Sequence, residues 1–377
     1  MIYFDNAATT FPKPPQVREA VNQAFTLYGA NPGRSGHDLS VQTAAQVYAV
    51  REAAAEFFGV SGPEQVVFTQ NCTHGLNLVV HGLLQQGDHV VISDLEHNSV
   101  LRPVHTLAQQ GIITYSVAET FPGEEETVES FRRCIHPNTR LILCTHGSNV
   151  FGWKLPIEAL ARLARAEGIL MAVDAAQTAG VARLDLEEQG IDFLSTAGHK
   201  GLYGPSGTGL LVTRRGDLLQ PLFQGGTGSL SADYNQPELM PDRLESGTVN
   251  TMGILGLGAG LRFVREKGVS LIAQEELAVA RRLQEGLAQI PQVQLYSPGR
   301  LPVVSFNLRG LHSEETAQLL NQEGFALRGG LHCAPLAHRK MGTLETGTVR
   351  ASIGAFNTLE EADLLVEAVA KVAARAC

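Results

Sequence analysis

The stretch ILMAVDAAQT, from Ile169 to Thr178, places five consecutive apolar residues directly before Asp174. A half-exposed strand alternates apolar and polar residues, whereas a run that is apolar throughout is typical of a strand buried on both faces of a parallel sheet. Helices must then cover both faces of that sheet. The stretch therefore predicts an α/β protein in which Asp174 ends a buried strand.

Similar apolar runs occur on both sides of this strand. QVVFT, HVVISD and RLILCT precede it and DFLSTA follows it, and helical patterns begin at about Thr73, Asn98 and Pro156. This alternation predicts a large domain, residues 15–256, with a mainly parallel seven-stranded sheet and right-handed crossovers.

After about Gly256 the pattern changes to one long helical stretch, followed by short strands such as LPVVSFNL. We therefore predict a smaller α+β domain made of residues 1–14 and 257–377. Thr358 and Glu361 have the spacing of a capping box, which predicts the start of the last helix.

The balance of charged residues argues against some classes of binding partner. The 377 residues include 29 Lys and Arg against 38 Asp and Glu, so the formal net charge is −9. We expect no binding to nucleic acid or to an anionic membrane. The start, MIYFDNAATT, lacks the basic and apolar segments of a signal peptide, and no apolar run is long enough to span a bilayer, so we expect a cytoplasmic protein.

Polar side chains follow several of the predicted strands at the point where each strand ends. In α/β sheets, ligands bind beyond the carboxyl ends of the strands, so these side chains are expected to share one crevice. They are His97, Asn149, Asp174, Gln177, His199 and Lys200.

Two of these residues indicate a cofactor. Asp174 ends a strongly apolar strand, where a carboxylate is costly unless a cation pairs with it. Lys200, in AGHKGLYGP, lies between a strand and a glycine-rich loop, and a desolvated lysine there is suited to forming a Schiff base. Together they match the binding signature of pyridoxal 5′-phosphate, PLP. Alternatively, Lys200 is a solvated loop lysine, and Asp174 is a helix N-cap or a metal ligand.

Two further features fit a flat phosphorylated cofactor. The stretch FTQNCTHGLNLVV predicts a helix that begins near Thr73, and a helix N-terminus binds phosphate, although Thr73 also suits a plain N-cap. His97 is suited to stacking on a ring, although a lone histidine is more often at the surface or paired in the core.

Cys333, in RGGLHCAPL, has three possible roles: an inert buried thiol, a metal ligand with His332 and His338, or a nucleophile. Gly329 and Gly330 predict an exposed loop, which favours the nucleophile, and the metal site lacks a fourth ligand at standard spacing. The remaining cysteines are scattered without a CxxC pair, so we interpret them as ordinary structural thiols. These are Cys72, Cys134, Cys144 and Cys377.

Jointly these motifs resemble the PLP-dependent transferases of fold type I, within them the class V aminotransferase fold, and in particular its cysteine desulfurases of the SufS-like group. The resemblance covers nearly the whole chain. It rests on FDNAATT, NPGRSGHDLS, FTQNCTHGLNLV, LEHNS, THGSNVFG, VDAAQTAG, GHKGLYGPSGTG, ESGTVNT, RGGLHCAPL and VRASIGAFNT, in that order.

The resemblance implies a role for each site residue. Lys200, Cys333 and His97 are catalytic: Lys200 carries PLP and moves a proton, Cys333 accepts sulfur, and His97 stacks on the ring. Asp174 holds the pyridine nitrogen and Gln177 the ring hydroxyl. The remaining cofactor residues are Cys72, Thr73, His199 and, reaching the neighbouring subunit's phosphate, Thr248. The substrate-binding residues are Asn149, Arg350, Arg328 and His37.

The sequence departs from the family pattern at three positions. Ala197 stands in place of a phosphate-binding serine, so either the phosphate affinity is altered or the neighbouring Ser195 and Thr196 compensate. Cys72 stands where the family often has a threonine, and Leu331 replaces one of two adjacent histidines before Cys333. Positive charge on His332, Arg328 or His338 would favour the thiolate of Cys333.

The implied activity is conversion of L-cysteine to L-alanine by a homodimer, with a persulfide formed on Cys333 and passed to an acceptor thiol or protein. Such sulfur mobilisation serves iron–sulfur cluster assembly among other uses. Alternatives are a selenocysteine lyase that takes L-selenocysteine, a cysteine sulfinate desulfinase, a PLP-dependent C–S β-lyase or epimerase, and a protein of the same fold without turnover.

Overall fold

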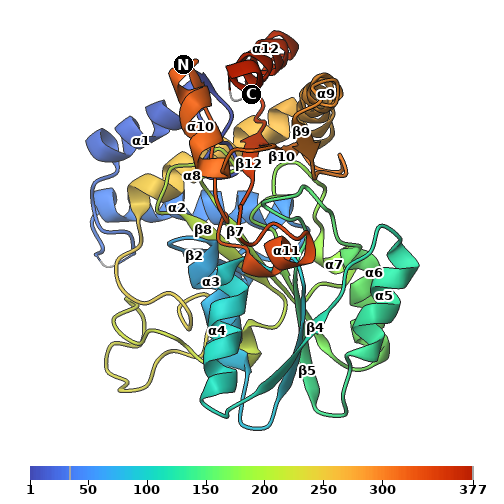
Figure 1. Cartoon of the computed structure of the whole chain (residues 1–377). Coiled ribbons are helices and arrows are strands. Elements are labelled where there is room, and N and C mark those ends of the chain that lie inside the picture. Colours follow the sequence, from blue (N-terminus) through green and yellow to red (C-terminus); the bar gives the residue numbers. More distant parts are fainter. Residues whose placement is uncertain (34, 376–377) are drawn as a thin grey trace.

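The computed structural model describes residues 1–33 and 35–375, so Cys377 lies outside the described residues. Its centre is a seven-stranded sheet with the order β2-β8-β7-β6-β5-β3-β4 (Figure 1). Its strands are β2 (Val66–Thr69), β3 (His89–Ser93), β4 (Thr114–Ala118), β5 (Thr139–Thr145), β6 (Leu170–Asp174), β7 (Phe193–Ala197) and β8 (Gly209–Thr213).

Within this sheet, β8 is antiparallel to its neighbours β2 and β7, and the remaining pairs are parallel. The predicted seven-stranded, mainly parallel sheet is therefore confirmed. Strand β6 lies between β5 and β7, and Asp174 is in register with Thr145 on one side and Ser195 on the other. The apolar run Ile169 to Val173 thus places Asp174 on the middle strand of the sheet.

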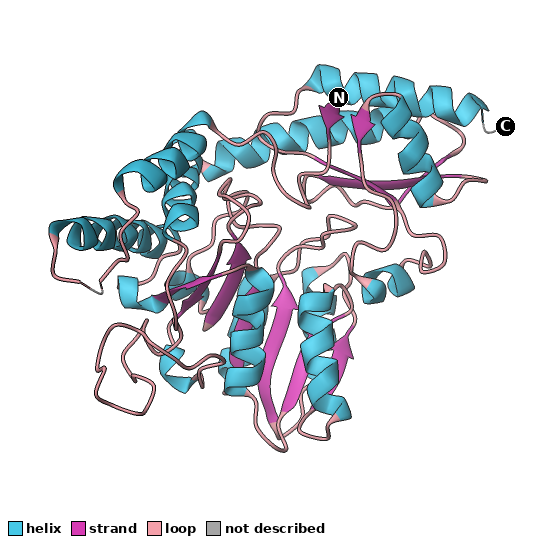
Figure 2. Ribbon diagram, turned by 90° about the vertical axis from the view of Figure 1, so that its left-hand side faces the viewer, coloured by secondary structure: helices cyan, strands magenta, loops and turns pink. Residues whose placement is uncertain are grey.

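Helices cover both faces of this sheet, as Figure 2 shows. One face packs against α3 (Cys72–Leu83) and α4 (Asn98–Gln109), which contribute Leu76 and Val104 to the core. The other face packs against α2 (Asp38–Phe57) and α6 (Ile157–Ala166). The observed starts of α3, α4 and α6 lie within one residue of the predicted ones. The other elements of this part are α1 (Pro15–Leu27), η1 (Pro63–Gln65), α5 (Glu124–Arg133), α7 (Leu186–Gln189) and η2 (Gly216–Leu218).

The C-terminal part of the chain forms two smaller sheets. β10 (Val303–Leu308) pairs antiparallel with both β9 (Val293–Leu295) and β12 (Val349–Ser352). β1 (Ile2–Tyr3) pairs parallel with β11 (Phe325–Ala326), so the first residues of the chain lie beside its last third. Both chain ends lie at the same end of the molecule in Figures 1 and 2. The helices here are α10 (Ser313–Gln322), α11 (Pro335–Lys340) and α12 (Leu359–Arg375).

The helical stretch predicted after Gly256 is two helices rather than one. α8 (Thr251–Lys267) and α9 (Val269–Leu287) are separated by Gly268, whose φ of +88° is unsuited to a right-handed helix. The predicted capping box is confirmed, because Thr358 N–H donates to Glu361 and Glu361 N–H donates back to the Thr358 hydroxyl, each at 3.2 Å. Within the described residues, no helix is both long and apolar enough to cross a membrane.

A buried acid connects the loop after Lys200 to the C-terminal part. Tyr203 donates to Glu276 of α9 at 3.2 Å and accepts from the backbone N–H of Ala355 at 2.7 Å. Burial is the main cause that raises the pKa of Glu276 to about 8. At neutral pH the folded protein therefore holds a proton on Glu276 that the unfolded chain does not.

This proton predicts how Glu276→Gln changes stability with pH. The folded pKa exceeds the unfolded value of about 4.5, so the stabilisation of the wild type falls as pH rises between ~4.5 and ~8, by at most about 1.4 kcal/mol per unit. Glutamine has no such proton to lose, so the variant should gain stability relative to the wild type across that range. Urea unfolding at several pH values measures the difference. Glu275→Gln, on the same helix and paired with Lys267 at the surface, is the matched control and should show no comparable trend.

Candidate active site

A cavity of about 90 Å³ lies at the carboxyl ends of the sheet strands, around Asp174 and Lys200. The structure brings eight of the predicted site residues to its walls: Cys72, Thr73, His97, Asn149, Asp174, Gln177, His199 and Lys200. Asn71, Ser99, Thr145, Gly147, Ala176 and Ala197 complete the lining. The predicted shared crevice is therefore confirmed.

Lys200 follows β7 in a closely packed turn. Its carbonyl accepts from the Thr10 hydroxyl at 3.0 Å and from Tyr203 N–H at 2.7 Å. Gly180 is required beside it, because a Cβ there would lie 2.0 Å from the carbonyl oxygen of Gly201. Burial is the main cause that lowers the pKa of the Lys200 amine, opposed by the charge of Asp174. A lowered pKa increases the uncharged, nucleophilic form of the amine, as carbonyl chemistry requires.

Asp174 is only 3% exposed. Its Oδ1 accepts from Ala176 N–H at 2.9 Å and lies 3.3 Å from the sulfur of Cys72. The carboxylate does not cap a regular helix, since β6 is followed by a turn. Among the described residues, no group of three His, Cys, Asp or Glu side chains is placed to hold a metal ion.

The walls of this cavity offer donors for a phosphate. Asn71, not Thr73, caps α3, since it accepts from His74 N–H at 2.8 Å, so the alternative of Thr73 as N-cap is wrong. Thr73 therefore lies in the first turn of the helix and lines the cavity. Nδ1 of His199 is buried and has no hydrogen-bond partner among the described residues.

The absent serine at Ala197 is not replaced from within β7. The Ser195 hydroxyl donates to the carbonyl of Cys72 at 2.9 Å, and the Thr196 hydroxyl donates to the carbonyl of Ala175 at 3.4 Å. Ala197 lines the cavity, but Ser195 and Thr196 do not. Thr196 faces the opposite side of the sheet from Ala197, and Ser195 faces the same side but its hydroxyl is held by the carbonyl of Cys72. The idea that Ser195 or Thr196 compensates is therefore wrong, because neither side chain lines the cavity.

His97 caps α4 through Nδ1, which accepts from Ser99 N–H at 3.0 Å. Nδ1 therefore lacks a proton in the neutral ring and Nε2 carries it. Burial is the main cause that lowers the pKa of His97, so the ring is neutral at pH 7. A neutral, oriented imidazole is suited to stacking on an aromatic cofactor. His37 caps α2 in the same way but is exposed and does not line the cavity.

Arg350 lies behind the cavity wall and is 1% exposed. One of its terminal nitrogens donates to Asp5 at 2.6 Å and the other donates to the carbonyl of Asn149 at 3.0 Å, while Nε has no partner among the described residues. Arg328 is joined to Arg350 through backbone hydrogen bonds but has an exposed side chain. Sequence reasoning missed Asp5, although it lies within the quoted motif FDNAATT and is a carboxylate able to neutralise a buried arginine.

Cys333 is exposed on a loop whose backbone is fastened to the cavity. Its carbonyl accepts from Asn98 N–H, the first residue of α4, at 2.7 Å. The carbonyl of His332 accepts from the Asn149 side chain at 2.8 Å. His332 and Cys333 both adopt positive φ, +49° and +58°, which turns the chain sharply at the thiol. The predicted exposed loop is confirmed.

Neither histidine near Cys333 supplies positive charge to it. His332 is buried with Nε2 against the carbonyl of Thr348 at 2.9 Å, and burial is the main cause that lowers its pKa to about 2. Burial likewise lowers the pKa of His338 to about 4. Both rings are neutral at pH 7, so their predicted role in favouring the thiolate is wrong, and Arg328 is the remaining cation of that set.

Thr248 lies away from this cavity and is exposed. It lines a separate cavity of about 500 Å³ together with Tyr48, Arg51 and Met240. Within this one chain, Thr248 therefore does not meet Lys200.

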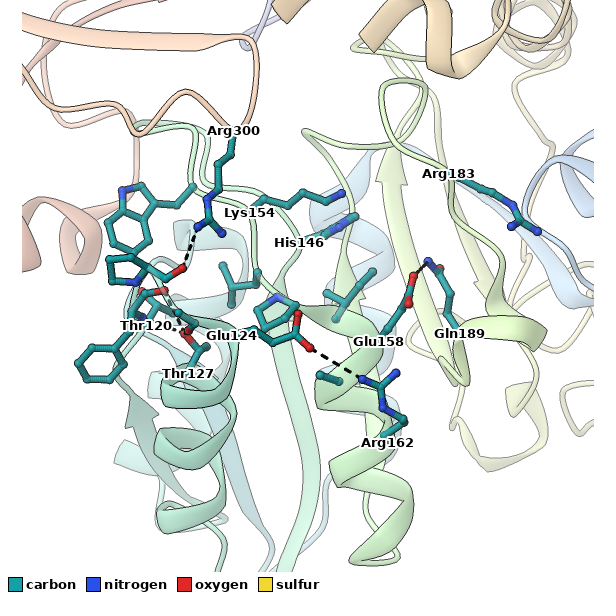
Figure 3. Close-up of a pocket in the computed structure, with 18 residues that line it drawn as sticks. Thr120, Glu124, Thr127, His146, Lys154, Glu158, Arg162, Arg183, Gln189 and Arg300 are labelled. Atoms are coloured by element: carbon teal, nitrogen blue, oxygen red, sulfur yellow. Dashed lines mark hydrogen bonds and ion pairs between the residues drawn. The ribbon is translucent and has the colours of Figure 1, made fainter. Parts of the chain in front are cut away.

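Figure 3 shows another cavity, of about 320 Å³, at the N-termini of α5 and α6. Two of its arginines already have partners. Arg162 forms an ion pair with Glu124 at 3.9 Å, and Arg300 donates a hydrogen bond to the carbonyl of Pro122 at 2.8 Å. None of the predicted site residues lines it. We therefore place the active site at Lys200 rather than in this larger cavity.

Comparison with known proteins identifies the family. The family model described as aminotransferase class-V matches residues 2–365. The chain is 34% identical to a cysteine desulfurase of Salmonella dublin, with 99% of this chain and 93% of that protein covered. It is also 34% identical to a probable cysteine desulfurase of Mycolicibacterium paratuberculosis, but it spans only 55% of that protein.

A solved structure gives the same result. The apo structure of the cysteine desulfurase from Thermococcus onnurineus superposes with a TM-score of 0.91 at 34% identity, covering 99% of this chain and 95% of that one. With a family model along nearly its whole length and relatives of this identity, the chain belongs to the aminotransferase class-V family, among its cysteine desulfurases.

Proposed function

We propose that this protein is a PLP-dependent cysteine desulfurase, which converts L-cysteine to L-alanine and forms a persulfide on Cys333. The observation that carries the proposal is the convergence of Lys200 and Asp174 on one cavity to which the Cys333 loop is fastened by Asn149. An amine and a carboxylate in one cavity, with an accessible thiol on the loop attached to its wall, are the groups that this reaction needs.

The cavity walls fit PLP. Lys200 has an amine of lowered pKa for the aldehyde carbon, and Asp174 is a buried carboxylate that forms no ion pair with any described lysine or arginine. Thr73, the start of α3 and the unpartnered Nδ1 of His199 suit the phosphate. Gln177 and His97 would hold and cover the ring. When bound, PLP supplies the capacity to withdraw electrons from the Cα of an amino acid.

The protein's own residues perform the remaining steps. The Lys200 amine would take the Cα proton of the substrate. Cys333 as thiolate attacks the substrate sulfur, so that an S–S bond forms while the C–S bond breaks. The electron pair of the broken bond stays with the carbon skeleton, which takes up protons and leaves as alanine. The persulfide on Cys333 then passes its outer sulfur to an acceptor thiol or protein.

The substrate carboxylate would meet Arg350, with support from Asn149, Arg328 and, more remotely, His37. The unpartnered Nε of Arg350 is a free donor at this place, and Asp5 occupies one of the terminal nitrogens. Because a bidentate pair with arginine uses two N–H groups, the carboxylate would compete with Asp5 for the second one.

The proposal includes a homodimer in which Thr248 reaches the partner's phosphate site. Exposed apolar side chains on α1, α2 and the loop before α8 support it, since large exposed apolar surfaces mark contacts between proteins. They are Phe25, Leu27, Leu39, Val41, Tyr48, Phe223, Leu230 and Leu239. The cavity that contains Thr248 and Tyr48 lies in the same region.

The dimer predicts the effect of a charge on this face. Leu39→Asp should produce a monomer that binds PLP at least about 10-fold more weakly, because a buried carboxylate opposes association and a site completed by the partner is lost. Light scattering gives the mass, and absorbance titration gives the affinity. Leu364→Asp, at another exposed leucine but on α12, should leave both unchanged. A dimeric Leu39→Asp protein would place the interface elsewhere.

Three further expectations belong to this proposal. The large domain would consist of residues 15–256, and the small domain of 1–14 and 257–377. The protein would act in the cytoplasm. Its sulfur would enter pathways such as iron–sulfur cluster assembly.

Product analysis tests the proposed activity directly. Purified protein loaded with PLP and given L-cysteine should release alanine in amounts equal to the sulfur transferred. Pyruvate with ammonia would instead identify a β-lyase, and racemised cysteine would identify an epimerase. L-Selenocysteine and L-cysteine sulfinate in parallel reactions decide between the desulfurase and its nearest alternatives.

A further inference from the structure

We infer that Cys72 is a positioning residue for Asp174: its S–H group donates a hydrogen bond to one carboxylate oxygen and leaves the other oxygen for the cofactor. The sulfur of Cys72 lies 3.3 Å from Oδ1 of Asp174, within hydrogen-bond range for sulfur. Both side chains are almost fully buried, since Cys72 is 6% exposed and Asp174 is 3% exposed. The part of this inference that concerns the cofactor rests on the proposed function.

The position of Cys72 is fixed by its neighbours. It is the first residue of α3, and its carbonyl accepts from the hydroxyl of Ser195 at 2.9 Å. Ser195 in β7 is in turn the register partner of Asp174 in β6. The helix start is thus fastened to the strand beside Asp174, so the thiol has little freedom to turn elsewhere.

The direction of the hydrogen bond follows from the chemistry of its two ends. An ionised carboxylate only accepts, so the proton must come from sulfur. Burial, with the nearby charge of Asp174, raises the pKa of the Cys72 thiol well above its usual value, and the thiol therefore keeps its proton.

The two oxygens of Asp174 then have different surroundings. Oδ1 receives the S–H of Cys72 and the N–H of Ala176. Oδ2 receives no hydrogen bond from the described residues, and Asp174 lines the cavity. Two donors on one oxygen fix the rotation of the carboxylate, so Oδ2 is the oxygen available to a protonated ring nitrogen. Cys72 therefore acts on the cofactor through Asp174 rather than through the phosphate.

Cys144 provides a natural comparison within the chain. It lies on β5, is fully buried and is also close enough for the charge of Asp174 to affect its pKa, yet its thiol forms no hydrogen bond among the described residues. The other titratable groups around Asp174 are Lys200, His97 and Glu96, and these stay the same in every variant below.

The hydrogen bond itself is tested without cofactor or turnover. The infrared S–H stretch lies in a region free of other protein bands, and it shifts to lower wavenumber when the thiol donates. The difference spectrum of cofactor-free wild type minus Cys72→Ala isolates the band of Cys72, and wild type minus Cys144→Ala isolates that of a free buried thiol. We expect the Cys72 band at lower wavenumber, and we expect it to move to the Cys144 position in Asp174→Ala. Coinciding bands in the wild type would overturn the inference.

The effect on the cofactor is tested by titrating its visible absorption band with pH. Loss of the donor in Cys72→Ala leaves more negative charge on Asp174, which favours the protonated form of the bound cofactor. The pH at the midpoint of this absorbance titration should therefore rise by roughly half a pH unit. Cys72→Ser retains a donor and should restore the wild-type midpoint, whereas a merely structural role would give both variants the same midpoint. Thermal unfolding of both variants confirms that they fold. A protein that never acquires a visible band refutes the proposed cofactor instead, and leaves the infrared result standing.

Discussion

Cys333→Ser should lower the release of sulfur from L-cysteine by at least about 1,000-fold while the protein still binds PLP. A factor of 1,000 corresponds to about 4 kcal/mol of transition-state stabilisation. Serine is nearly isosteric, but its hydroxyl is not ionised at neutral pH and does not accept sulfur as a persulfide. Because Cys333 is exposed and the loop is held through backbone groups, the fold should be unaffected.

Sulfide formation in the presence of a reducing thiol, together with the visible absorption of the bound cofactor, measures both halves of this expectation. Mass spectrometry of the wild type after brief exposure to cysteine should find one additional sulfur atom on the peptide that contains Cys333. Cys134→Ser, a partly buried cysteine away from the cavity, is the control and should retain full activity. Undiminished sulfur release by Cys333→Ser would identify a lyase in which this thiol is incidental.

Lys200→Ala should lose activity by at least about 1,000-fold and lose the covalent attachment of PLP. The amine of lowered pKa at the end of β7 is the group that would bond to the cofactor and move the Cα proton, and alanine replaces neither function. In the wild type, borohydride reduction should fix PLP on the peptide that contains Lys200.

Lys154→Ala is the matched control, since Lys154 is an exposed lysine in the cavity of Figure 3. It should keep both the colour and the activity. Cofactor fixed by borohydride at any lysine other than Lys200 would contradict our placement of the active site.

Much of the large sheet could be predicted because its strands are apolar at nearly every position. The run before Asp174 identified a strand buried on both faces, and the polar residues at the strand ends identified the cavity. Periodicity did not distinguish α8 from α9, because one glycine in a helical pattern is compatible with a helix interior. Only the φ of Gly268 in the folded chain shows the break.

The chemical states of the site residues were less predictable. Sequence spacing placed His332 beside Cys333, but it did not show that the ring is buried against Thr348 and uncharged. The contact between Cys72 and Asp174 joins residues 102 positions apart, so no local pattern reports it. Burial and long-range pairing, which set pKa values, depend on the completed fold.

The ion pair between Asp5 and Arg350 also has a consequence for biosynthesis. Its partners are separated by 345 positions. Strand β1 likewise pairs with β11, which is synthesised much later. At about 5–20 residues per second, a ribosome needs roughly 17 to 70 s to extend the chain from one partner to the other. During that time the N-terminal segment has neither its strand partner nor its counter-ion. Arg350, which we propose binds the substrate carboxylate, therefore pairs with Asp5 only after the 345 positions between them have been spanned, which delays catalytic competence until Arg350 has been synthesised.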